Sequence, residues 1–204
     1  MDAATRLATA DDVDAIVETI TLAFLPDPIW GRALALPDGS TDHVALFWRP
    51  FVLHAVETSS AYLRGDAATI ALWTPPGGVE LTPEGEAEWE RLANEILPAD
   101  RAAALMTLYD RFDASHPHDE EHAYLGFLAT HPDHRGTGIG QQLLVDTLEV
   151  WDAQGVPTYL ESSNPANNHR YERAGFRSIG HIDAVLNDAR IELMWRDAIQ
   201  PIVM

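Results

Sequence analysis

Cysteine is absent from this 204-residue sequence, and its absence excludes several kinds of site. Without a thiol there can be no disulfide framework, no thiolate zinc site and no cysteine nucleophile. Long hydrophobic runs are also missing, so the sequence predicts no transmembrane helix. The first residues, Met1, Asp2, Ala3 and Ala4, contain no basic stretch followed by an apolar block, which argues against a signal peptide. We therefore expect a cytoplasmic protein with no membrane partner.

Positive charge is scarce as well. The 13 basic residues, all of them arginines, stand against 32 aspartates and glutamates, which gives a formal net charge of -19. Nucleic-acid affinity comes largely from basic side chains that displace counterions, so we expect no nucleic-acid partner. A strongly acidic protein attracts small cations, which suits an amine substrate, although acidity also serves solubility alone.

The order of predicted strands and helices indicates a single domain over residues 1–204. Hydrophobic residues make up 46% and charged residues 22% of the chain, the mix of an ordinary globular protein. Helical spacing of apolar residues predicts helices over about 13–24, 41–57, 82–114 with a break at Pro98, 139–154 and 166–174. Strands are predicted at 5–8, 60–63, 67–74, 123–130, 158–162, 176–185 and 190–195. We expect an α/β fold in which helices flank a mixed, mostly antiparallel sheet of six to seven strands.

A glycine-rich loop joins the strand 123–130 to the helix 139–154. The first turn of a helix has free N–H groups and a partial positive charge, and glycines let a diphosphate approach that backbone closely. Gln141 and Gln142 stand where a P-loop needs lysine and Ser or Thr, and Gln141 also replaces the third glycine of a dinucleotide fingerprint. The alternative, that this loop is only a glycine-rich start of a helix and binds no ligand, remains open. The loop consists of Arg135, Gly136, Thr137, Gly138, Ile139 and Gly140.

This loop has the Arg/Gln-x-x-Gly-x-Gly/Ala pattern of the GNAT-type (GCN5-related) N-acetyltransferases. The preceding segment 128–134 also resembles that family, as does a second element made of residues 160–163, Asn167 and residues 171–176. Within the family, the chain is most similar to the puromycin N-acetyltransferase-like branch. The resemblance is strong over about 123–176 and only topological elsewhere.

The resemblance implies an acetyl-CoA-dependent N-acetyltransferase, with acetyl-CoA as cosubstrate and no metal. The pantetheine arm of the cofactor is expected to pair with the backbone of Leu128, Ala129 and Thr130, and the pyrophosphate to bind the amides of residues 135–140. Asn167 matches an asparagine that hydrogen-bonds the cofactor, a role compatible with capping the short helix.

Tyr171 matches the family tyrosine near the thioester sulfur. A phenol there donates a proton to the leaving thiolate or stabilises its charge, whereas the alternative is a buried core tyrosine. The general base is left open between Glu161 at the end of a strand, Glu121 and His122 at the start of another, and an ordered water.

The other conspicuous side chains have ordinary explanations. Histidines cluster between residues 116 and 134, but their spacing matches no zinc-binding pattern, so no metal is expected. Trp30, Phe47, Trp48 and Trp73 are candidates for an acceptor pocket, although core packing is the commoner role of such residues.

The predicted reaction is direct attack by a primary amine on the acetyl thioester in a ternary complex. The amine is expected to belong to a small cationic molecule, such as an antibiotic, a polyamine or an amino-sugar derivative. A backbone N–H of the strand that bears Leu128 is expected to meet the developing oxyanion. The alternative is a coenzyme A-binding sensor or regulator without turnover. The protein is expected to act as a monomer or homodimer.

Overall fold

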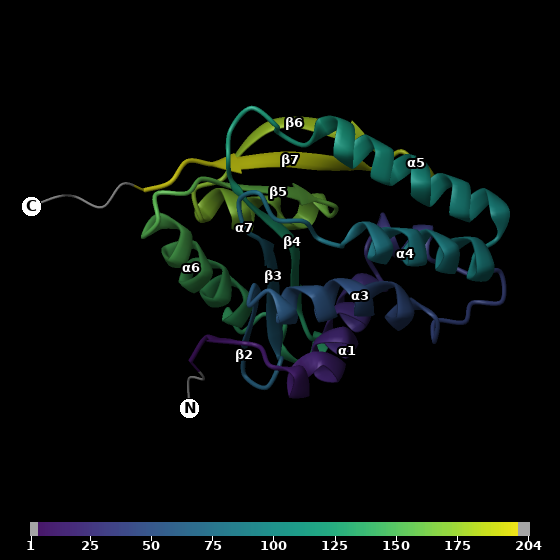
Figure 1. Cartoon of the computed structure of the whole chain (residues 1–204), viewed down its shortest axis with the longest axis horizontal. Helices are drawn as coiled ribbons and strands as arrows, with labels where there is room; N and C mark the ends of the chain where they lie inside the picture. Colours follow the sequence, from purple (N-terminus) through teal and green to yellow (C-terminus); the bar gives the residue numbers. More distant parts are fainter. Residues whose placement is uncertain (1–3, 200–204) are drawn as a thin grey trace, which may run out of the picture.

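The computed structural model describes residues 4–199, which form a seven-stranded sheet with helices on both faces (Figure 1). The strand order is β1-β2-β3-β4-β5-β7-β6. Neighbouring strands are antiparallel except β4 and β5, which run parallel. The expected mixed, mostly antiparallel sheet is confirmed. Residues 1–3, on which the argument about a signal peptide partly rests, lie outside the described part of the chain.

Most elements form where the sequence predicts them. The strands are β1 Arg6–Leu7, β2 Ala61–Arg64, β3 Thr69–Thr74, β4 Ala123–Thr130, β5 Thr158–Ser162, β6 Arg177–Asp183 and β7 Arg190–Arg196. The α-helices are α1 Val13–Phe24, α2 Trp30–Ala33, α3 Val44–Glu57, α4 Pro83–Ile96, α5 Ala99–Ser115, α6 Ile139–Asp152 and α7 Asn168–Arg173. Short 3-10 turns are η1 Ala10–Asp12, η2 Pro132–His134 and η3 Pro165–Asn167. Helix α2 was not predicted, because four residues are too few to show helical periodicity.

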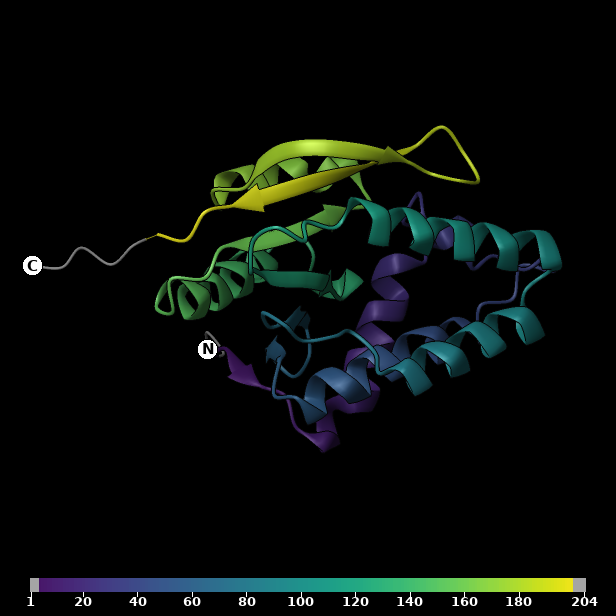
Figure 2. The same ribbon diagram turned by 45° about the horizontal axis from the view of Figure 1, so that its top comes forward.

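Each face of the sheet is covered by its own set of helices (Figures 1 and 2). Helix α6 packs on one face, where Leu143, Leu144 and Trp151 join a buried cluster with Trp73 and Leu125. Helices α1, α3, α4 and α5 build the larger core against the other face. Among the described residues, no helix is long and apolar enough to cross a bilayer.

The centre of the sheet is opened by two local features of β4. Its parallel pairing with β5 extends only over Ala123 with Thr158 and Tyr124 with Tyr159. Two steps further along β4, the register with β3 shifts, so that Gly126 forms a β-bulge. Beyond Tyr124 the two parallel strands diverge and leave backbone N–H and C=O groups of β4 without a β5 partner. The opened sheet matches the expected place for a cofactor arm.

Candidate active site

A cavity of about 650 Å³ lies where β4 and β5 diverge. It is continuous from the glycine loop, through the opened sheet, to the ends of α1 and α5 on the other side. It therefore brings together the two sequence elements that carry the resemblance. The predicted cofactor residues that line it are Leu128, Ala129, Thr130, Arg135, Gly136, Gly138, Ile139, Gly140, Asn167 and Tyr171. Thr137 does not line it, and its exposed side chain donates a hydrogen bond to the His134 carbonyl (2.7 Å).

The start of α6 presents unpaired backbone amides. Gly138 is the N-cap and has a left-handed backbone with φ 85°, which leaves this helix end without a side-chain cap. The first helical hydrogen bond runs from the Gln142 N–H to the Gly138 carbonyl (3.0 Å). The amides of Ile139, Gly140 and Gln141 therefore remain free, as expected for the first turn of a helix. A Cβ built on Gly136 or Gly138 meets no atom within 4 Å, so an anion has room to approach both residues.

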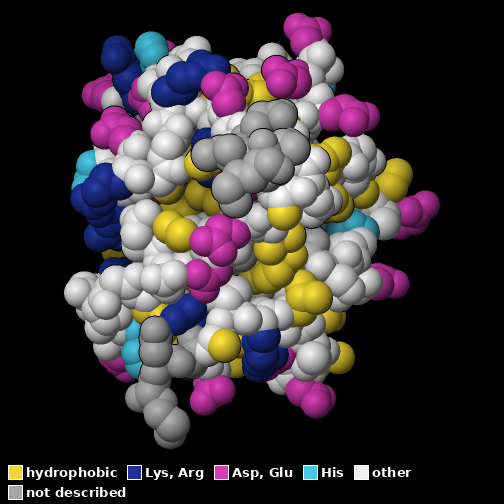
Figure 3. Space-filling view, turned by 90° about the vertical axis from the view of Figure 1, so that its left-hand side faces the viewer, with side chains coloured by type: hydrophobic (Ala, Val, Ile, Leu, Met, Phe, Trp, Pro, Cys, Tyr) yellow, Lys and Arg dark blue, Asp and Glu magenta, His cyan; other side chains and the backbone are white. Residues whose placement is uncertain are grey.

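Positive side chains surround this anion site even though the protein is strongly acidic. Arg135, Arg170 and Arg173 all line the cavity. The Arg135 guanidinium donates to the Ala23 carbonyl at the end of α1 (3.2 Å), which fixes the loop against that helix. On the face shown in Figure 3, several basic side chains gather at the left edge, and others lie among acidic side chains over the rest of the face. The local charge thus favours a phosphorylated ligand.

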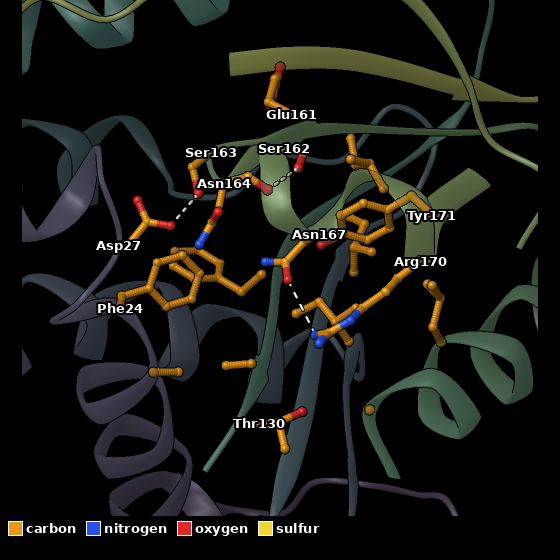
Figure 4. A pocket seen from close by; sticks show the side chains of 18 of the residues that line it. Phe24, Asp27, Thr130, Glu161, Ser162, Ser163, Asn164, Asn167, Arg170 and Tyr171 are labelled. Atoms are coloured by element: carbon orange, nitrogen blue, oxygen red, sulfur yellow. Dashed lines mark hydrogen bonds between the residues drawn. The ribbon is translucent and has the colours of Figure 1, made fainter. Parts of the chain in front are cut away.

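Tyr171 and Asn167 lie on one side of the cavity, as Figure 4 shows. Tyr171 packs its ring edge-on against Phe176, with 6.0 Å between the ring centroids. Burial raises the pKa of Tyr171 to about 12, so its phenol keeps its proton at neutral pH. Asn167 accepts a hydrogen bond from Arg170 (3.2 Å) at the start of α7. The pair offers a proton donor and an amide beside the expected path of the cofactor.

Glu161 extends from β5 in the opposite direction. Figure 4 shows its side chain pointing away from those of Asn167 and Tyr171. The side chain is only 4% exposed, and its neighbours are the phenols of Tyr124 and Tyr159. Among the described residues no arginine pairs with this buried carboxylate, so a cationic ligand bound there would offset part of the cost of burying its charge.

Glu80 is a second acidic group of the cavity, and the sequence reasoning missed it. It follows the Pro-Pro-Gly-Gly break and lies over the bulge of β4, where a Cβ on Gly126 would be 2.3 Å from the Glu80 Oε1 atom. Burial, and then the nearby charge of Glu161, raise the pKa of Glu80 to about 8. The one sequence signal was a glycine inside a strand, which often marks a bulge or a close approach.

Two phenols and a second missed carboxyl group complete this part of the cavity. Burial, followed by the charges of the two glutamates, raises the pKa values of Tyr109 and Tyr124 well above the ordinary phenol value. Asp27 accepts hydrogen bonds from the backbone N–H groups of Ile29 (2.9 Å) and Trp30 (3.1 Å). Its other oxygen accepts from the Ser163 hydroxyl (2.8 Å), which joins the end of α1 to the loop after β5 (Figure 4).

The remaining candidate bases lie elsewhere. Glu121 is exposed and does not line the cavity. His122 is also outside the cavity, with its ring against Tyr159 and Trp195. Of the three named side chains, only Glu161 reaches the cavity.

Of the four aromatic candidates for an acceptor pocket, one lines the cavity and three do not. Trp30 lines the cavity and stacks on Phe112, with 6.0 Å between the ring centroids. Phe47, Trp48 and Trp73 are buried in the core and do not line the cavity. Within residues 4–199, no group of three or more histidines and acidic residues is arranged to hold a metal ion.

Replacement of Glu80 by glutamine is expected to stabilise the protein at alkaline pH. Because the folded-state pKa is about 8 against an ordinary 4.5, the unfolded chain loses this proton first as pH rises. Stability therefore falls between these two pH values and stays low above them. We expect the melting temperature of Glu80→Gln to exceed that of the parent by at least about 2–4 °C at pH 9 and to equal it near pH 4. Equal melting temperatures at both pH values would show that the carboxyl group titrates normally.

Comparisons with known proteins address the fold and the domain type. Residues 99–178 match the family model described as acetyltransferase (GNAT) domain. An uncharacterized N-acetyltransferase from Schizosaccharomyces pombe is 28% identical over 127 residues, which cover 55% of this chain and 48% of the relative. The matched region thus spans about half the length of that curated relative.

Two solved structures are similar over almost the whole chain. A histone acetyltransferase HPA2 and related acetyltransferase from Corynebacterium glutamicum is 23% identical, with a TM-score of 0.66 and 100% coverage of both chains. Arylalkylamine N-acetyltransferase 2 from Aedes aegypti is 15% identical, also with a TM-score of 0.66, and covers 96% of this chain and 99% of its own. At these identities the likeness shows a shared fold. The segment matched by the family model contains β4, the glycine loop, β5 and α7. This chain therefore has the GNAT fold, and its residues 99–178 match the GNAT acetyltransferase domain model.

Proposed function

We propose that this protein transfers the acetyl group of acetyl-CoA to the primary amine of a small cationic molecule. The observation that carries the proposal is the continuous cavity, which has free helix amides and arginines at one end and a pair of buried carboxyl groups at the other. The first end suits a diphosphate and the second suits an ammonium group. The whole chain, residues 1–204, would work as a single domain, as a monomer or homodimer in the cytoplasm.

The proposed position of acetyl-CoA follows the lining of the cavity. The diphosphate binds the free amides at the start of α6, and the pantetheine arm pairs with the unpartnered edge of β4 at Leu128, Ala129 and Thr130. This places the thioester in the gap between the diverging strands. An amide of β4 then lies beside the carbonyl oxygen, where it stabilises the oxyanion that develops during attack.

The two glutamates have different proposed roles. Glu80 retains its proton at neutral pH because its pKa is raised to about 8. It therefore carries no negative charge there and can donate a hydrogen bond. Glu161 is the member of the pair that accepts the proton of the substrate ammonium. The aromatic rings of Trp30 and Phe112 lie on the same side and can contact the body of the amine. The resemblance to the puromycin N-acetyltransferase-like branch favours an antibiotic-like, polyamine or amino-sugar acceptor.

Tyr171→Phe is expected to lower kcat by about 10–100-fold, because the departing thiolate loses the phenol that protonates it or stabilises its charge. The KM for acetyl-CoA should change little, since the phenyl ring retains the packing against Phe176. The matched control is Tyr62→Phe, which alters a half-buried tyrosine of β2 that does not line the cavity. A Tyr171→Phe enzyme with unchanged kcat would remove the tyrosine from the proposed mechanism.

A panel of amines tests the proposed function directly. The purified protein is mixed with acetyl-CoA and primary amines of different size and charge, and both free thiol and N-acetylated product are measured. We expect equal amounts of thiol and product with small cationic amines. Acetylation of protein acceptors alone would contradict the proposed substrate class. Thermal stabilisation by acetyl-CoA without amine-dependent thiol release would identify a coenzyme A-binding sensor instead.

A further inference from the structure

Each turnover of the proposed reaction leaves one proton on the protein. The ammonium gives a proton to the Glu161 carboxylate, its nitrogen bonds to the acetyl carbon, and the C–S bond breaks with its electron pair on sulfur. The thiolate takes the Tyr171 proton, and the second proton lost by nitrogen restores that phenol. Glu161 thus ends the cycle protonated. Because its side chain is 4% exposed and the substrates fill the cavity, this proton needs another way out.

A pair of histidines joins Glu161 to the surface. His116, at the end of α5, has its Nδ1 atom 3.8 Å from the Glu161 Oε1 atom and a side chain that is 27% exposed. Its Nε2 atom lies 3.0 Å from the Nε2 atom of His122. The ring is held edge-on between Tyr124 and Tyr159, with centroid distances of 5.1 and 5.0 Å. The arrangement places His116 between Glu161 and solvent, 3.8 Å from the Glu161 carboxylate.

The hydrogen bonds define which nitrogen atoms carry protons. The His122 Nδ1 atom is 2.8 Å from the Glu120 carbonyl, which can only accept, so this nitrogen bears the proton. Burial lowers the pKa of His122 and keeps the ring neutral. Its Nε2 atom must then accept, and His116 donates to it from Nε2. A neutral His116 consequently has a bare Nδ1 atom, and that atom faces Glu161.

We propose that His116 takes the proton from Glu161 on Nδ1 and, as an imidazolium, releases that same proton to solvent at the exposed part of its ring, which restores the Nε2–H tautomer. His122 is a positioning residue that fixes this tautomer by accepting from the His116 Nε2–H. The proposal rests on the proposed function. The gap of 3.8 Å has to close by about 1 Å for a direct hydrogen bond, a common adjustment when substrates bind. The titratable groups that face the histidine pair are His118 from the adjoining loop, Glu120, Tyr124, Tyr159 and Glu161.

The first test uses the kinetics of thiol release. His116→Gln and His116→Ala are expected to lower kcat by about 10–100-fold at neutral pH, with an unchanged melting temperature and unchanged KM for acetyl-CoA. Added imidazole should restore the rate of His116→Ala in proportion to its concentration, which a structural defect would not allow. The control is His118→Gln, because His118 contacts the His116 ring at 5.8 Å but is bonded to the Asp113 carbonyl and not to Glu161. It should stay within twofold of the parent.

The second test measures the tautomers by 15N NMR of the free protein. In the parent protein, His116 should be protonated on Nε2. In His122→Phe, it should be a mixture of the Nδ1–H and Nε2–H tautomers. A parent His116 protonated on Nδ1, or a His116→Ala enzyme that keeps full activity from pH 6 to 9, would overturn the relay and leave acetyl transfer intact. If no amine releases thiol from acetyl-CoA with the parent protein, the proposed function fails and the relay fails with it.

Discussion

Glu161→Gln is expected to lower kcat/KM by about 10²–10⁴-fold, the range found when a positioned general base is removed. Glutamine has nearly the same shape, and its amide oxygen can still accept from the neighbouring Tyr124 and Tyr159 phenols. The substitution removes the negative charge that binds the ammonium and takes its proton. The melting temperature should therefore be equal or higher, because an unpaired buried charge is lost. The affinity for acetyl-CoA should not change.

The matched control for this substitution is Glu121→Gln. Glu121 was an equal candidate from the sequence, but it is exposed and does not line the cavity. Steady-state thiol release at several pH values should show parent activity for the control. If Glu161→Gln retains activity within threefold of the parent while Glu80→Gln loses it, the roles of the two glutamates are exchanged. If both retain activity, an ordered water is the base.

Gly138→Asp is expected to weaken acetyl-CoA binding by about 100-fold or more, equivalent to about 2.7 kcal/mol. Aspartate and asparagine enter the left-handed backbone of this N-cap (φ 85°) at a lower cost than other side chains, and a Cβ there meets no atom within 4 Å. The protein should therefore fold normally. The new carboxylate would occupy the anion site and repel the diphosphate. Calorimetric titration with acetyl-CoA measures the loss, which should shrink at high salt because screening weakens the repulsion.

Two controls isolate the effect of charge. Gly138→Asn has the same shape without the charge and should lose much less affinity than the aspartate. Gly155→Asp introduces the same charge at another left-handed glycine (φ 69°) with open space around it, in a turn that does not line the cavity. It should bind acetyl-CoA like the parent. Equal affinity for Gly138→Asp and the parent would show that the diphosphate binds elsewhere.

The sequence predicted the strands and the helix around the glycine loop well, because the information that specifies them is local. Strands β4 and β5 have the predicted bounds. The glycine loop falls between a strand and a helix, where its amides are free. A loop of this kind is specified within a few residues, so local pattern and family resemblance both reach it.

The acceptor end could not be predicted because it depends on contacts between distant segments. Glu80 meets Gly126 only through the pairing of β3 with β4 and the bulge in that pairing. Asp27 reaches Ser163 across 136 positions of the chain. His116 approaches Glu161 only because α5 ends beside β5. No hydrophobic periodicity and no short sequence motif marks any of these contacts. Side chains that are 40 or more positions apart are brought together by the packing of the fold.

Hydrogen exchange of the protein with and without acetyl-CoA tests the central claim most directly. The cofactor is proposed to bind the free amides that start α6 and the unpartnered edge of β4. Saturating acetyl-CoA should therefore slow exchange of the amides in residues 136–141 and 126–130, and leave the β6–β7 hairpin unchanged. Absence of binding, or binding that protects other segments while both of these exchange at their original rates, would contradict the account.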